Sequence, residues 1–199
     1  MGVLGKLNPD VRTPNIDKMA DNGIIFTNNC VTTSVCWISR ATLMTGLYYS
    51  RHLQGKPHVD SMFTTHNWNL TLFPRLRRER NYYTGLVGKW HAPQPKPEMS
   101  AAFDHTIAYY GDHWLNWFSD KNPKEMEYVT ELNRRHAIEF LRKRPLNQKF
   151  ALKVSFFATH AWDGRFPSYQ PTNSTRNSYY PDSPDHSNYT KIEIGRAHV

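Results

Sequence analysis

The sequence predicts an α/β fold with a mainly parallel sheet sandwiched by helices. Helical patterns are followed by short apolar strands at residues 12–28 and 69–90, and again where a long helix at residues 123–145 precedes an apolar strand at 149–160. Strands that alternate with helices favour parallel pairing, because parallel neighbours need a long crossover connection. In such folds ligands bind beyond the C-terminal ends of the strands.

The first helix is predicted from the residues that can begin and end it, and the first strand from the apolar run that follows. Thr13 can cap a helix, Pro14 suits its first position, and Gly23 can end it. Its predicted apolar face consists of Ile16, Met19 and Ala20. The run IIFTN at residues 24–28 then predicts a strand entering the core, and a second short helix is predicted over residues 39–45, stopped at Gly46.

The later elements have stronger patterns. Thr71 and Pro74 indicate the start of a third helix, which leads into a buried strand at residues 82–90. The longest helix ends before Pro145, and the residues of its predicted inner face recur at helical spacing: Val129, Leu132, His136, Ala137, Phe140 and Leu141. From residue 163 onward the pattern dissolves, which indicates either a long loop or an element whose partners are absent.

Composition narrows the class of protein. A chain of 199 residues with 39% hydrophobic residues can form one domain, and its net charge of +8 favours an acidic partner. No nucleic-acid motif accompanies the charge, so we expect no nucleic-acid partner. The two cysteines exclude a disulfide scaffold and a zinc cluster. No apolar run is long enough for a membrane span, and the first residues do not form a signal peptide.

One of the two cysteines, Cys36, lies in a sequence motif that indicates a function. A lone cysteine such as Cys36 is more often a small buried hydrophobe than a nucleophile. The string CWISRATLMTG, residues 36–46, nevertheless resembles the sulfatase signature at five positions: Cys36, Ser39, Arg40, Thr45 and Gly46. The segment leading to Cys36, the strand YYTGLVGKWH and the strand VSFFATHA also resemble sulfatase segments in the same order. The resemblance covers about residues 3–189.

The resemblance implies a set of catalytic residues. It implies that a formylglycine-generating enzyme oxidises Cys36 to formylglycine, whose hydrated diol attacks the sulfur of a sulfate ester. It assigns Arg40 to holding the diol and Lys89 and His91 to contacts with sulfate and formylglycine. His160 is assigned to the sulfate or the leaving oxygen, so that Lys89 and His160 bind substrate. Such positive groups suit a pocket for an anion.

The resemblance also implies a divalent cation, generally calcium. Formylglycine made from Cys36 is one ligand, and we expect the remaining oxygen ligands to lie outside this chain. The expected fold is therefore the alkaline-phosphatase-like sulfatase fold, incomplete at both ends. Ile38 stands where the signature usually has proline.

Domain limits follow from these expectations. Residues 1–193 are expected to be a partial sulfatase catalytic domain. The last residues, 194–199, back-translate to a short-read sequencing adapter followed by a stop codon, so we expect this tail not to be biological. Five further histidines have no match in the resemblance and are expected to be structural: His58, His66, His105, His113 and His136.

The functional expectation is hydrolysis of a sulfated carbohydrate or an aryl sulfate ester. One alternative is a phosphoester or phosphonate hydrolase of the same superfamily. Another is a non-catalytic protein that binds sulfated glycans through its positive charge. The full-length protein is expected to be secreted, lysosomal or periplasmic.

Overall fold

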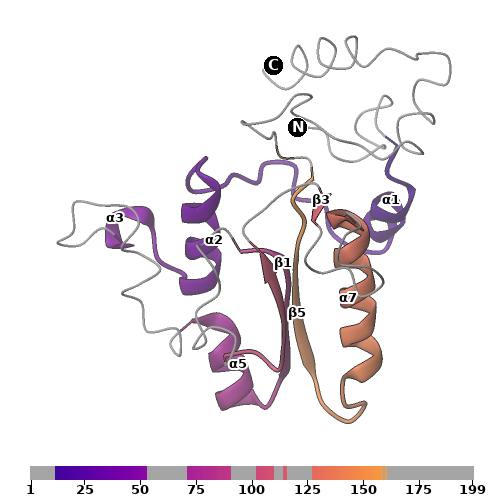
Figure 1. Cartoon of the computed structure of the whole chain (residues 1–199). Coiled ribbons are helices and arrows are strands. Elements are labelled where there is room, and N and C mark those ends of the chain that lie inside the picture. Colours follow the sequence, from indigo (N-terminus) through magenta and orange to yellow (C-terminus); the bar gives the residue numbers. More distant parts are fainter. Residues whose placement is uncertain are drawn as a thin grey trace, which may run out of the picture. The chain divides into compact units, whose positions relative to one another are not determined.

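The computed structural model describes residues 12–52, 71–90, 102–109, 114–115, 127–158 and 160. The chain divides into two compact units, one formed by Met1–Val31 with Ser187–Val199 and the other by Thr32–His186. The first unit contributes helix α1, and the second contributes the other described elements (Figure 1). These are α2 (Cys36–Thr45), α3 (Tyr49–His52), α5 (Leu72–Arg80), β1 (Tyr83–Lys89), β2 (His105–Tyr109), β3 (Trp114–Leu115), β4 (Glu127–Tyr128), α7 (Val129–Lys143) and β5 (Phe150–Ser155).

Helix α1 (Pro14–Asp21) confirms the predicted first helix. Pro14 occupies the first turn, and the Thr13 hydroxyl donates a hydrogen bond to Asp17 Oδ1 at 3.1 Å. The helix contains no buried residue, so the apolar face expected from its spacing is not part of a core. Ile16 and Met19 are both exposed.

The centre of the second unit is a three-stranded parallel sheet in the order β2-β1-β5. Gly85 is the register partner of both His105 and Leu152, so β1 lies between its two neighbours. Two further strands, β3 and β4, form a separate antiparallel pair. The predicted α/β class with mainly parallel pairing is therefore confirmed.

Helices cover the two faces of this sheet, as Figure 1 shows for α2 and α5 on one side and α7 on the other. Leu86 points toward the first side, where it is buried in a cluster with Met44 of α2 and Phe73 of α5. The preceding residue, Gly85, lies against the Phe140 ring of α7 on the opposite side. Alternation along β1 thus explains why nearly the whole strand is buried.

The ends of the helices follow their sequences. Gly46 ends α2 in the left-handed conformation, with φ of 72°. Asn81 ends α5 in the same conformation and leads directly into β1. Asp104 then ties α5 to the sheet, because its carboxylate pairs with Arg77 at 2.9 Å and accepts a hydrogen bond from the Thr84 amide at 2.8 Å.

Two predicted elements need correction, and one strand of the main sheet was missed. The run at residues 24–28 is not a strand, and Ile24 and Phe26 are exposed, because a short apolar run does not by itself specify a partner strand. Helix α7 begins at Val129, since the two residues before it pair with β3 as β4. Strand β2 was not predicted at all, because it has few apolar residues and no clear alternation. The predicted loop after residue 163 and the tail at 194–199 lie outside the described residues.

Within the described part of the chain, no helix is both long and apolar enough to cross a membrane.

Candidate active site

Cys36 is the first residue of α2 and is partly buried. Val35 precedes it in an extended conformation and provides no side-chain cap for the helix. The backbone N–H groups of a first helical turn lack partners within the helix, and the helix dipole favours negative charge at this end. The local structure at Cys36 therefore suits an anionic ligand.

Arg40 lies one turn after Cys36 and joins α2 to the end of β1. Its Nη1 donates a hydrogen bond to the backbone carbonyl oxygen of Lys89 at 3.0 Å. Burial lowers the pKa of Arg40 from its ordinary value, while the nearby Cys36 and Tyr109 act in the opposite direction. Arginine stays charged in proteins, so this guanidinium is a fixed positive group beside the cysteine.

Lys89, the last residue of β1, is only 2% exposed. Its Nζ lies 4.7 Å from the centroid of the Phe157 ring, in a cation–π contact. Because the stem of Lys89 is buried in the sheet and its ammonium group lies on an aromatic face, the charge is held in a defined place at the C-terminal end of the strand.

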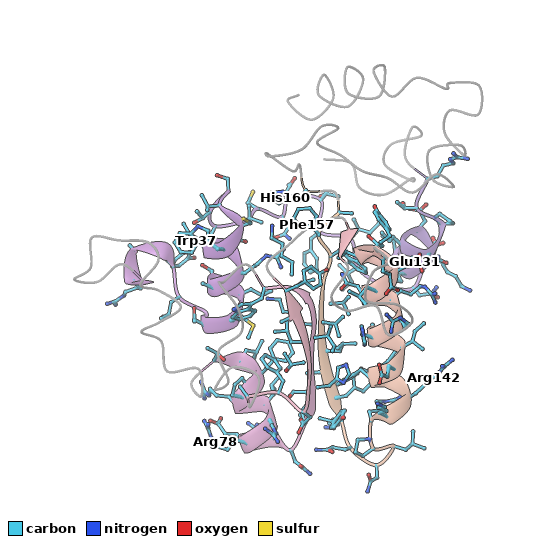
Figure 2. All side chains as sticks on the ribbon, viewed as in Figure 1. Trp37, Arg78, Glu131, Arg142, Phe157 and His160 are labelled. Atoms are coloured by element: carbon cyan, nitrogen blue, oxygen red, sulfur yellow. The ribbon has the colours of Figure 1, made fainter. Side chains whose placement is uncertain are left out.

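His160 lies beyond the end of β5 and contacts the same Phe157 ring as Lys89 does. Its ring stacks on Phe157 with centroids 5.0 Å apart, and its backbone N–H donates to the Phe157 carbonyl oxygen at 2.8 Å. Figure 2 shows Phe157 and His160 beyond the same end of the sheet at which α2 begins. Phe157 therefore links Lys89 to His160.

Tyr109 is the last residue of β2 and lies at the same end of the sheet as Lys89. Burial raises the pKa of Tyr109, with the Asn133 hydrogen bond and the charge of Arg40 acting in the opposite direction. The neutral phenol donates to Asn133 Oδ1 at 3.0 Å, and the Tyr109 carbonyl oxygen accepts from the Trp90 amide at 2.8 Å. These bonds fix the strand ends of β1 and β2 around Arg40.

The structure thus brings four of the five predicted site residues to one end of the sheet: Cys36, Arg40, Lys89 and His160. His91 lies outside the described residues. Sequence reasoning missed Phe157, Tyr109 and Lys153, a buried residue of β5. The signal for Lys153 was present, because it is the one charged residue within the apolar run FALKVSFF.

The residues described do not fit a metal ion by themselves. Among them there is no group of three His, Cys, Asp or Glu side chains that could hold one. A calcium ion needs about six oxygen ligands, and of the expected ligands only residue 36 lies in the described ranges.

Comparison with known proteins gives a consistent family. The sulfatase family profile matches residues 1–192. The chain belongs to the sulfatase family. N-acetylglucosamine-6-O-sulfatase of Bacteroides thetaiotaomicron is 31% identical over 157 residues, which cover 75% of this chain and 26% of that protein. Human N-acetylgalactosamine-6-sulfatase is 25% identical over 195 residues, covering 81% of this chain and 37% of the relative.

Solved structures agree with the fold. The crystal structure of yidJ from Bacteroides fragilis matches with a TM-score of 0.60 and 25% identity, over 79% of this chain and 41% of that chain. The structure of Ps i-CgsB in complex with k-i-k-neocarrahexaose matches with a TM-score of 0.61 and 22% identity, over 93% of this chain and 46% of that chain. This sulfatase chain spans less than half the length of these relatives.

Proposed function

We propose that the chain is part of the catalytic domain of a sulfuric ester hydrolase that acts on a sulfated carbohydrate. The observation that carries this proposal is the pairing of Cys36, at the start of α2, with Arg40, whose guanidinium is bound to the end of β1 at Lys89. Two family members whose matches cover at least three quarters of this chain are named for 6-sulfates of N-acetylated sugars, which supports a carbohydrate substrate.

The proposed chemistry uses residue 36 in its oxidised form. As formylglycine it hydrates to a geminal diol, of which one hydroxyl can attack sulfur and displace the alcohol, while the other can lose its proton and expel inorganic sulfate. A serine would lack this second step, which explains why a modified cysteine is needed. In the family a metal ion typically assists; the described residues supply no shell for it.

The other site residues would act through charge and position. Arg40 provides a fixed positive group within reach of residue 36, and Lys89 provides a second at the end of β1. Donors and charges that are already in place stabilise the negative charge that develops on sulfate oxygens in the transition state. We assign His160 to the sulfate or to the leaving oxygen, where an imidazole can supply a proton. His91 keeps its predicted role beside Lys89.

The decisive experiment is the mass of the peptide that contains residue 36. Trypsin releases residues 19–40, because Lys18 and Arg40 bound this segment, so the peptide contains both Cys30 and Cys36. After co-expression with a formylglycine-generating enzyme we expect a loss of about 18 Da, the change from CH2SH to CHO, located at residue 36 by fragmentation. Cys30→Ser should keep the loss and Cys36→Ala should abolish it.

The other functions predict different results. An unmodified thiol at residue 36 would contradict the proposed chemistry, and salt-sensitive heparin binding that survives Cys36→Ala would then favour a glycan-binding protein. Faster hydrolysis of phosphate monoesters than of sulfate monoesters would favour the phosphoester hydrolase. We further propose that the full-length protein is secreted, lysosomal or periplasmic.

A further inference from the structure

Lys153 places a positive charge inside the sheet. It is the fourth residue of β5 and is 9% exposed. Its register partner on β1 is Leu86, which is buried against α2 and α5, so Lys153 points toward the same face. Its Nζ lies 5.6 Å from the centroid of the Trp90 ring. Lys153 therefore lies on the sheet face that α2 and α5 cover, with its ammonium group near Trp90, the residue after β1.

Lys153 and its cationic neighbour Arg40 each have a buried nitrogen that lacks a hydrogen-bond partner among the described residues. Lys153 Nζ and Arg40 Nε are both buried, and the described residues offer neither nitrogen a hydrogen-bond acceptor. Burial, and to a smaller extent the charge of Arg40, lowers the pKa of Lys153 to about 8. Two positive groups from different elements, α2 and β5, thus lie within electrostatic reach of each other.

Such a pair is costly without a negative partner. A buried charge without a counter-ion strongly destabilises a protein, and a second charge of the same sign adds repulsion. The face of Trp90 compensates only in part. An anionic group with two oxygens could accept from both nitrogens and would turn the repulsion into attraction.

We propose that Arg40 and Lys153 together bind an anionic oxygen group, either a sulfate-type oxyanion or a carboxylate from elsewhere in the protein. Lys153 is then an anion-binding residue of the site, additional to those in the sulfatase signature. The proposal deepens the proposed function and rests on it only for the choice of sulfate as the free anion. It does not depend on the modification of Cys36.

Thermal unfolding tests the proposal on the purified protein. The melting temperature is measured against sodium sulfate, with sodium chloride at matched ionic strength, for wild type, Lys153→Met and Lys149→Met. Lys149 is exposed and lies just before β5, so its variant carries the same substitution without the buried site. Sulfate stabilises proteins in general, and this general effect should be equal in all three.

If a free oxyanion binds, the wild type and Lys149→Met should show an additional, saturable rise with sulfate. Lys153→Met should melt higher than wild type without sulfate, because a buried charge is gone, and its sulfate-dependent rise should fall to less than about half. Lys153→Arg keeps the charge and should keep the additional rise.

If a carboxylate of the protein fills the site, Lys153→Met should melt lower than wild type, or fail to fold, at every sulfate concentration, while Lys153→Arg folds. Two outcomes would overturn the proposal: an additional, saturable rise with sulfate that is equal in wild type and Lys153→Met, or a Lys153→Met that is at least as stable as a wild type without the additional rise. The mass of residue 36 is unaffected by these outcomes, so failure of this proposal and of the sulfatase chemistry can be told apart.

Discussion

Phe157 shows how one apolar side chain can organise a charged site. Its ring contacts the Lys89 ammonium group on β1 and stacks on the His160 ring beyond β5. The residue is itself 4% exposed and packs in a cluster with Tyr109, Val129 and Leu132, so the ring cannot move freely. We regard Phe157 as a positioning residue for two groups, one at the end of β1 and one in the segment after β5.

Replacing Phe157 by Leu should therefore impair turnover. The substitution removes the aromatic face, so Lys89 and His160 lose a shared contact of about 1 to 2 kcal/mol, and we expect kcat to fall about tenfold with a smaller change in KM. The measurement is steady-state hydrolysis of a soluble sulfate ester by the full-length protein oxidised at residue 36. Phe156→Leu is the matched control, because Phe156 is the exposed neighbour. Equal activity of the two variants would refute the positioning role.

Some of the site residues could be predicted from the sequence, and others could be found only in the structure. Cys36, Arg40, Lys89 and His160 stand in recognisable strings, and the rule that ligands bind at the C-terminal ends of parallel strands placed the last two correctly. Phe157 and Tyr109 could not be found in this way, because their roles arise from contacts between strands whose order the sequence does not state. Lys153 was visible as an isolated charge, but its partner on α2 was not.

At the scale of single elements, Gly88 sets the separation of β1 and β5. It has φ of 105°, and a Cβ at this position would lie 2.1 Å from the Ser155 carbonyl oxygen. No side chain fits there unless the two backbones move apart. Since Lys89 follows directly, this close approach also determines where the site lysine leaves the strand.

Gly88→Ala should destabilise the protein more than Gly46→Ala does. At Gly46 the backbone is also left-handed, with φ of 72°, but nothing lies within 4 Å of the place that an alanine methyl group would take, so only the conformational cost of about 1 to 2 kcal/mol applies. At Gly88 the clash with backbone is added, and we expect a loss of about 3 kcal/mol or more. Urea unfolding measures both. Equal losses would show that the strands separate easily.

The predicted elements succeeded where helical spacing was long and failed where a partner was needed. Helix α7 was recognisable because its apolar positions repeat over four turns, and Leu132 and Phe140 are fully buried as expected. The run at residues 24–28 was as apolar as a strand, yet a strand exists only when a neighbour offers hydrogen bonds. The strand β2, with its weak pattern, is specified instead by its pairing with β1.

At the scale of the whole molecule, the two ends of the sheet carry different chemistry. The C-terminal ends hold the cationic site, while the other end holds His105 at the start of β2 and His136 on α7, with ring centroids 6.4 Å apart. Both histidines were expected to be structural. His136 is 7% exposed, and its Nδ1 lies 3.1 Å from Glu139 Oε2. The sequence could place His136 in a helix, but it predicted neither the strand of His105 nor the proximity of the two rings.

This histidine pair predicts how the stability of the molecule depends on pH. Burial lowers the pKa of His105 below its ordinary value; the charge of Glu139 raises it, and His136 and Lys143 lower it. The unfolded chain then binds more protons than the folded chain as the pH falls through the ordinary pKa of about 6.5. Stability from neutral His105 is therefore complete above that pH and is lost as the pH falls toward the lower pKa of the folded state.

The free energy of unfolding should consequently decrease as the pH falls from about 7 to about 5. In His105→Asn this decrease with pH should be less steep than in the wild type. Urea unfolding at several pH values measures the slope, and staying above about pH 5 avoids the titration of Glu139, whose pKa is lowered mainly by its hydrogen bond with Lys143. His160→Asn is the control, because that exposed ring lies at the opposite end of the sheet. An unchanged slope in His105→Asn would mean that burial at this end of the sheet does not oppose protonation, and the acid sensitivity of the molecule would then have to arise from its carboxylates.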